Sequence, residues 1–136
     1  MHVYRRNKAA LLFYQPGKEC LAGNHFLMDQ RGLVSGTAKV NDASVRVSIL
    51  FDTGSNALTI PSVLFQEKGS VLNLSLPGTV DEHVLSIPYN HNNWNNRQVL
   101  ESTSRTIIVG VTFLQGYSIG TIVTQDFSYL TLNPIL

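Results

Sequence analysis

Residues 50–55, Leu-Phe-Asp-Thr-Gly-Ser, place a carboxylate directly after an apolar run and before a glycine and two hydroxyl residues. An ionised Asp52 at the end of a buried strand needs hydrogen-bond donors, and a tight loop supplies them as backbone N–H groups and hydroxyls. Gly54 lets the backbone approach a partner closely because it has no Cβ. The same tetrapeptide is common turn chemistry. These residues alone therefore leave two interpretations of Asp52, a functional carboxylate and the cap of an ordinary turn.

The run from Ile49 to Ser62 resembles the active-site segment of the pepsin-like and retropepsin-like aspartic peptidases. Those families show an apolar pair, Asp-Thr-Gly-Ser/Thr/Ala, and a short strand that in pepsins often ends at proline. Residues 107–110, Ile-Ile-Val-Gly, are similar to a second family element, which a short helix follows, here at Phe113-Leu114. The segment from Tyr117 to Asn133 resembles the closing hairpin of these proteins, with Asp126 between its two strands.

The resemblance implies an all-β, acid-protease fold, namely a pepsin- or retropepsin-like β-barrel lobe with one or two short helices over residues 33–136. It implies that Asp52 is catalytic. Family members use two aspartates, one from each of two lobes or subunits, to activate the water that attacks the peptide carbonyl. The residues that it casts as support for the active-site loop are Thr53, Gly54, Ser55 and Gly110.

A single Asp-Thr-Gly is half of such a site, so the resemblance also implies a second lobe or an identical subunit as partner. The substrate would be a peptide or protein, with neither a cofactor nor a metal. Four other aspartates lie in no comparable context: Asp29, Asp42, Asp81 and Asp126. The 58 residues from Asp52 to Gly110 (110 − 52) favour a retropepsin protomer, whereas the stretch 58–62 and the tail favour a pepsin lobe, and both alternatives stay open.

The sequence departs from the family in the interval where a flap would close over the substrate. That interval offers only residues 76–79, Leu-Pro-Gly-Thr, and an Asn-rich stretch, residues 90–96, which predicts an exposed loop. Pro77-Gly78 is a good turn pair, either at a hairpin tip or in an ordinary surface turn. The missing flap and the single Asp-Thr-Gly motivate a second hypothesis, a catalytically inactive single lobe that binds peptides or proteins.

Composition limits the other classes of function. The chain has 136 residues, of which 43% are hydrophobic and 14% are charged, and this apolar content is enough for one packed domain. Its net charge of +1 gives no reason to expect nucleic acid as a partner, and its composition gives none to expect a membrane. Cys20, the one cysteine, cannot form an internal disulfide, and no Cys/His set has zinc-site spacing. No Gly-x-Ser-x-Gly elbow surrounds Ser55, which argues against a serine hydrolase.

Strand-forming residues in short runs bounded by Gly, Asn, Asp and Pro predict a mostly β chain. A hairpin with an Asn41-Asp42 turn is expected to lead into Asp52, and residues 106–109 should form a strand buried on both faces. The other predicted strands lie at 57–60, 71–76, 83–87, 117–124 and 129–132, with helical turns at 62–67 and 111–115.

Residues 1–32 are expected to be an N-terminal extension or a pairing segment. Arg5, Arg6 and Lys8 precede an apolar stretch too short for the core of a secretory signal. A pepsin-like protein would fit a secretory or lysosomal-type compartment, and an Asn-Leu-Ser sequon at Asn73 would accept glycan only there. The sequence therefore leaves localisation open.

Overall fold

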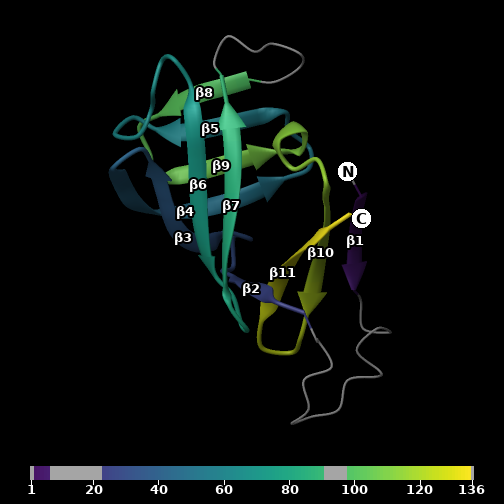
Figure 1. Cartoon of the computed structure of the whole chain (residues 1–136). Coiled ribbons are helices and arrows are strands. Elements are labelled where there is room, and N and C mark those ends of the chain that lie inside the picture. The colour runs from purple at the N-terminus through teal and green to yellow at the C-terminus, as the bar shows by residue number, and fades with distance from the viewer. Residues whose placement is uncertain (1, 7–22, 91–97, 136) are drawn as a thin grey trace.

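The computed structural model describes residues 2–6, 23–90 and 98–135, and the chain in these ranges is almost entirely β (Figure 1). The all-β fold predicted from the sequence is therefore confirmed. The strands are β1 (His2–Arg6), β2 (His25–Met28), β3 (Val34–Val40), β4 (Ala43–Asp52), β5 (Ala57–Pro61), β6 (Ser70–Pro77), β7 (Glu82–Tyr89), β8 (Gln98–Ser102), β9 (Thr106–Gly110), β10 (Tyr117–Val123) and β11 (Ser128–Pro134).

These strands form one sheet in the order β1-β10-β11-β2-β3-β4-β9-β5-β8, from which β6 branches at β3 and pairs with β7. The pairs β3–β4, β6–β7 and β10–β11 are antiparallel hairpins. The pairs β4–β9, β5–β8 and β1–β10 are parallel. Strand β9 therefore lies between β4 and β5, although 45 residues (106 − 61) separate it from the end of β5.

The β3–β4 hairpin forms where the sequence predicts it. Asn41 has φ of 53°, the left-handed conformation that asparagine tolerates in tight turns, and Val40 pairs with Ala43 across the turn. Ten residues of β4 then lead directly to Asp52. The turn therefore sets the register of the β3–β4 pair, and with it the position of Asp52 at the end of β4.

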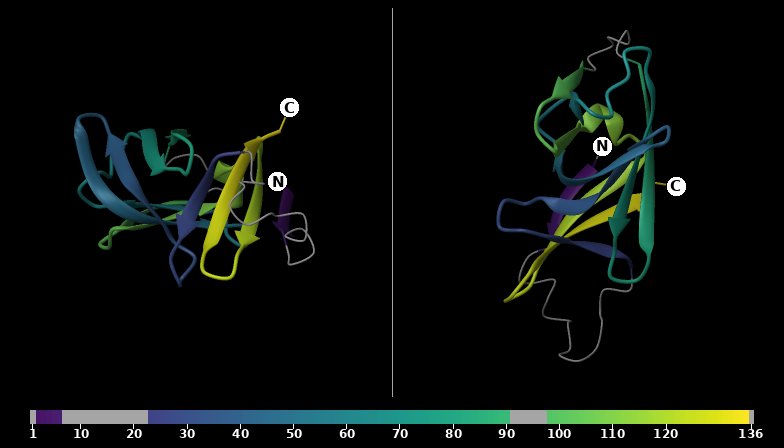
Figure 2. Two further views of the ribbon diagram at one scale, coloured as in Figure 1. Left: turned by 90° about the horizontal axis from the view of Figure 1, so that it is seen from below. Right: turned by 90° about the vertical axis from the view of Figure 1, so that its left-hand side faces the viewer.

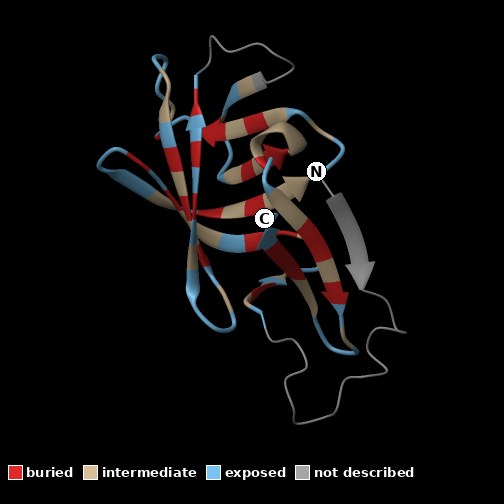
Figure 3. Ribbon diagram, turned by 45° about the vertical axis from the view of Figure 1, so that its right-hand side comes forward, coloured by how far each residue is buried: buried red, intermediate tan, exposed pale blue. Residues whose placement is uncertain are grey.

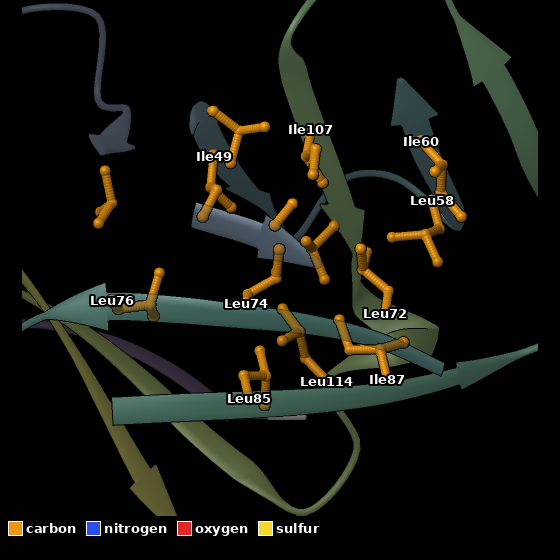
Figure 4. Packing of buried hydrophobic residues seen from close by; sticks show 14 of the residues in the cluster. Ile49, Leu58, Ile60, Leu72, Leu74, Leu76, Leu85, Ile87, Ile107 and Leu114 are labelled. Atoms are coloured by element: carbon orange, nitrogen blue, oxygen red, sulfur yellow. The ribbon is translucent and has the colours of Figure 1, made fainter. Parts of the chain in front are cut away.

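The hydrophobic core lies between the β6–β7 hairpin and strands β4, β5 and β9 (Figure 4). Alternate residues of β6 are fully buried, as period-two alternation requires of a strand with one face on the core. The right view of Figure 2 shows the hairpin as a long layer on one side of the other strands. The facing core residues are Leu72, Leu74, Leu76, Leu85 and Ile87 on one side, and Ile49, Leu58, Ile60, Ile107 and Val109 on the other.

Figure 3 shows that burial concentrates where the strands cross, while the turns between strands are exposed. Strand β9 was predicted to be buried on both faces, but only the face of Ile107 and Val109 is fully buried, and Thr106 and Ile108 on the other face are half-buried. The 3-10 helix η2 (Val111–Phe113) follows it at once. It coincides with the short helix predicted at 111–115.

The helical turn predicted at 62–67 is present as hydrogen-bonded turns, in which Phe65 N–H donates to the Pro61 carbonyl at 3.0 Å. Strand β8 follows the Asn-rich stretch and was not predicted. Residues 91–96 of that stretch lie outside the described residues, so the exposed loop expected there stays a prediction.

The segment before residue 33 contributes strands to the sheet. β2 pairs with β3 and β11, and its Phe26 is buried in the core; the left view of Figure 2 shows β2, β11 and β10 side by side. The division of the chain at residue 33 stays a prediction. No helix in the described ranges is long and apolar enough to span a membrane.

The turn from β2 to β3 depends on one carboxylate. Asp29 Oδ1 accepts hydrogen bonds from Arg31 N–H at 2.8 Å and Leu33 N–H at 3.0 Å, and Oδ2 lies 3.1 Å from Arg31 Nη2. The Leu33 N–H, more than any other group, lowers the pKa of Asp29. A lowered pKa stabilises the fold at pH values above the ordinary aspartate value, about 3.9, and this stabilisation is lost as the pH falls through the folded-state pKa.

We therefore expect Asp29→Asn to lower the melting temperature at neutral pH, with a difference from wild type that shrinks as the pH falls below about 4. Thermal denaturation followed by circular dichroism across this pH range measures the effect. Asp126→Asn, in the exposed β10–β11 turn, is the control and should leave the melting temperature unchanged. A difference for Asp29→Asn that stays constant with pH would contradict this assignment.

Candidate active site

The parallel pair β4–β9 positions the carboxylate singled out in the sequence. Asp52 is the last residue of β4, where it pairs with Gly110, the last residue of β9. The upstream residues Val47 and Ile49 are buried in the core, whereas Asp52 is half-buried. Strand β4 is therefore buried in the core before its last residues, and it ends with the Asp52 carboxylate at the edge of that core.

The loop after Asp52 provides the donors that its sequence predicts. Asp52 Oδ1 accepts a hydrogen bond from Gly54 N–H at 3.0 Å, and the Asp52 carbonyl accepts one from Ser55 N–H at 3.3 Å. No donor in the described chain lies within hydrogen-bond distance of Asp52 Oδ2. The carboxylate is thus held through one oxygen, and the other is available to a water or a second carboxyl group.

The two hydroxyl residues of the loop have different surroundings. Ser55 Oγ accepts a hydrogen bond from Ala57 N–H at 3.0 Å, so this hydroxyl orders the start of β5. The supporting role in the active-site loop that the resemblance assigns to Ser55 stays a prediction. Thr53 is exposed and its hydroxyl makes no hydrogen bond within the described residues. The Thr53 side chain is therefore available to a partner chain.

Gly110 lies against the backbone of the loop. A Cβ at this position would lie 2.6 Å from Ser55 O, Ala57 N and Ala57 O, a distance that real Cβ contacts essentially never show. The next residue, Val111, donates its N–H to the Ser55 carbonyl at 2.7 Å. The loop therefore packs directly on the main chain at the β9–η2 junction, and only glycine allows so close an approach.

Two threonines to which the sequence analysis assigned no role also hold this region together. Thr59 Oγ1 donates to the Thr106 carbonyl at 3.3 Å and accepts from Ile108 N–H at 2.8 Å, which fastens β5 to β9. Thr112 Oγ1 donates to the Asn56 carbonyl at 3.3 Å. Their signal in the sequence is weak, because a threonine in a strand usually reflects β propensity alone.

The structure brings no second aspartate of this chain to the loop. The other described aspartates lie in different turns: Asp29 between β2 and β3, Asp42 between β3 and β4, Asp81 between β6 and β7, and Asp126 between β10 and β11. Nor do the described residues contain a cluster of three or more His, Cys, Asp or Glu side chains that could hold a metal ion. The described part of one chain therefore provides one carboxylate at this loop.

The residues Pro77-Gly78 begin the tip of the β6–β7 hairpin, where Gly78 N–H donates to the Asp81 carbonyl at 3.1 Å. Asn24 holds this tip, because its Oδ1 accepts from Val80 N–H at 2.9 Å and its Nδ2 donates to the Asp81 carbonyl at 2.7 Å. In Figure 1 the tip lies beside β2, away from the carboxyl ends of β4 and β9. This hairpin covers the core and does not extend over Asp52.

Comparison with models of known protein families finds no match for this chain. Comparison with curated protein sequences finds none either. Among solved structures, the chain is similar to a retropepsin-like aspartic protease from Rickettsia conorii, with 12% sequence identity and a TM-score of 0.35 over 84% of this chain and 93% of that chain. A likeness at this level does not assign a function, so the geometry around Asp52 has to carry the proposal.

The close contact at Gly110 gives a direct test of this geometry. Gly110→Ala should destabilise the fold by roughly 1–3 kcal/mol or more, because the new methyl group meets backbone atoms that cannot rotate away. Gly23→Ala is the matched control, since a Cβ at Gly23 meets nothing within 4 Å. Urea denaturation measures both changes. Equal stability of the two variants would show that the loop does not pack on Gly110.

Proposed function

We propose that this chain is an aspartic endopeptidase unit, in which Asp52 pairs with a second aspartate to hydrolyse peptide bonds through an activated water. The observation that carries the proposal is the state of the Asp52 carboxylate. One of its oxygens is fixed by Gly54 N–H, and the other has no donor within the described chain. A general base needs a fixed position and a free oxygen, and Asp52 has both.

The second carboxylate has to come from another lobe or subunit, since the other described aspartates lie in separate turns. A two-fold homodimer is the simplest source, because symmetry about an axis beside the loop brings Asp52 and its copy together. Thr53 is exposed on the same loop and its hydroxyl is unpaired within the described residues. Its hydroxyl would donate a hydrogen bond to the facing loop of the partner.

The chemistry follows from holding two carboxyl groups close together. Two carboxyl groups at short range cannot both be ionised, because their like charges repel, so the pair holds one proton, as in the aspartic proteases. The ionised carboxylate removes a proton from water as the water oxygen attacks the peptide carbonyl, and the protonated carboxyl donates its proton to the carbonyl oxygen. The tetrahedral intermediate then collapses: the peptide nitrogen takes a proton from one carboxyl group, the C–N bond breaks, and a hydroxyl of the intermediate returns its proton to the other carboxylate, which restores the singly protonated dyad.

The same geometry supports a second candidate function, a catalytically inactive single lobe that binds peptides or proteins. Two observations favour it. The described chain holds one carboxylate at the loop, and hydrogen bonds from Asn24 hold the β6–β7 tip beside β2, so this hairpin does not close over Asp52. A lobe of this kind would use the face around Thr53 and Gly54 for docking.

Peptide cleavage over a wide dilution series distinguishes the two functions. If Asp52 acts in a dimer, the rate should fall with the square of protein concentration below the dimer dissociation constant. Asp52→Asn should cost roughly 10²–10⁴-fold in rate, because the base is lost. Asp42→Asn in the β3–β4 turn is the matched control and should cleave like wild type. An unfolded protein as substrate, assayed from acid to neutral pH, makes the test independent of sequence preference.

Analytical ultracentrifugation of the same samples completes the experiment. A chain that stays monomeric, folds normally and binds peptide without cleaving it would contradict the endopeptidase and support the binding lobe. Cleavage by Asp52→Asn at the wild-type rate would contradict the assignment of the catalytic residue.

A further inference from the structure

An open cavity of about 550 Å³ lies on the outer face of the sheet, where the β6–β7 hairpin diverges from β3. Strands β3, β4, β6 and β9 and the turn before β3 all contribute to its lining. Neither Asp52 nor any residue of its loop lines it. The cavity is therefore a separate feature, to which the proposed peptidase chemistry gives no role.

The lining contains two rows of polar side chains that cross neighbouring strands in register. Ser35 of β3 pairs with Ser48 of β4, which pairs with Thr106 of β9. Two residues along β3, on the same face, Thr37 pairs with Ser75 of β6 and with Arg46 of β4. None of these five hydroxyls makes a hydrogen bond within the described chain, so all are available to a ligand.

The cavity also carries positive charge. Arg31, Arg46 and Arg105 line it together with one carboxylate, Glu82. Arg31 is paired with Asp29 at 3.1 Å, whereas Arg46 and Arg105 form no ion pair within the described residues. Two unpaired guanidinium groups beside a field of hydroxyl donors favour an anion with several acceptor oxygens.

We propose that this cavity binds a phosphate monoester. The phosphate of such a ligand presents up to two negative charges and three acceptor oxygens, which match two guanidinium forks and the adjacent hydroxyls; a carboxylate has one charge and two oxygens and would leave one arginine without a counter-charge. A volume of about 550 Å³ is typical of small-ligand sites and exceeds what a phosphate ion alone needs. The Glu82 carboxylate accepts a hydrogen bond from a hydroxyl or ammonium group on the rest of the ligand.

The proposed phosphate site lies apart from Asp52. Ser48 and Thr106 lie four residues before Asp52 and Gly110 on the same two strands, a separation of roughly 13 Å along the sheet. Asp52→Asn should therefore bind the phosphate ester as wild type does. This variant separates the two proposals, because binding survives whether or not the chain cleaves peptides.

Isothermal titration calorimetry of the full chain tests the site with four probes: O-phosphoserine, a phosphoserine peptide, serine and the same peptide without phosphate. We expect binding of at least one phosphorylated probe and of neither unphosphorylated one. Binding of O-phosphoserine identifies a small metabolite as the source of the phosphate, and binding of the phosphopeptide alone identifies a modified protein. If neither phosphorylated probe binds, the proposal is wrong.

Charge-matched variants show whether the recognition is local. Arg46→Gln/Arg105→Gln should weaken binding at least tenfold, while Lys39→Gln/Lys68→Gln, which removes two charges outside the cavity lining, should leave it unchanged. Arg46→Lys/Arg105→Lys keeps the charge but loses the forks and should weaken binding several-fold. All of these side chains are exposed, so the variants should fold like wild type. Equal losses in the arginine and lysine pairs would show non-specific charge attraction and overturn the proposal.

Discussion

The backbone contact between Gly110 and residues 55–57 is the constraint on which the candidate active site depends. Ser55 O, Ala57 N and Ala57 O approach the α-carbon of Gly110 so closely that no side chain fits. The Val111 N–H hydrogen bond to Ser55 O closes the contact from the other side. Because main-chain atoms have no rotamers, this packing fixes the loop more firmly than side-chain contacts would. The position of Asp52, the residue from which the loop starts, therefore depends on this contact.

The core explains why β9 lies where that contact requires it. β9 joins β4 in a parallel pair and is followed along the sheet by β5, and parallel neighbours need both faces covered. The β6–β7 hairpin supplies part of that cover through alternating leucines and isoleucines (Figure 4). Strands β5 and β9 pair in register only at Leu58 and Val109, and Thr59 adds to this pairing, since its hydroxyl donates to the Thr106 carbonyl and accepts from the Ile108 N–H. The burial of apolar side chains thus brings distant segments together, and a few polar atoms set their register.

Local signals predicted much of this fold. Asn41-Asp42 predicted the β3–β4 turn because asparagine tolerates positive φ, and the continuous apolar run ending at Gly110 predicted strand β9, although only one of its faces is fully buried. Strand β8 was missed for a physical reason. It lies at the end of the sheet path, with Val99 half-buried and Leu100 exposed, and its backbone pairing with β5 makes it a strand. Pairing of that kind leaves little trace in the identity of the side chains.

The candidate site, like the fold, could be predicted from the sequence only in part. The sequence brings Gly110 to the loop of Asp52 and Gly54 only through family resemblance, whereas the structure shows which atoms meet. It also shows what a resemblance does not carry, such as the hydrogen bond from Ala57 N–H to Ser55 Oγ and the open cavity on the outer face of the sheet, whose polar rows come from four different strands. Rows of this kind depend on register, and register between distant strands is a property of the folded sheet.

The need for a second carboxylate follows from the chemistry of Asp52 itself. Peptide hydrolysis requires a base that takes a proton from water and an acid that gives one to the carbonyl oxygen in the same step, and one carboxyl group cannot be both ionised and protonated. In the loop, Gly54 N–H donates a hydrogen bond to Asp52 Oδ1 and holds the carboxylate in place, while no second carboxyl group of the described chain lies beside it. In the proposed reaction a single copy therefore supplies one carboxyl group, and the complementary one has to reach the unpaired Asp52 Oδ2 from outside the described chain.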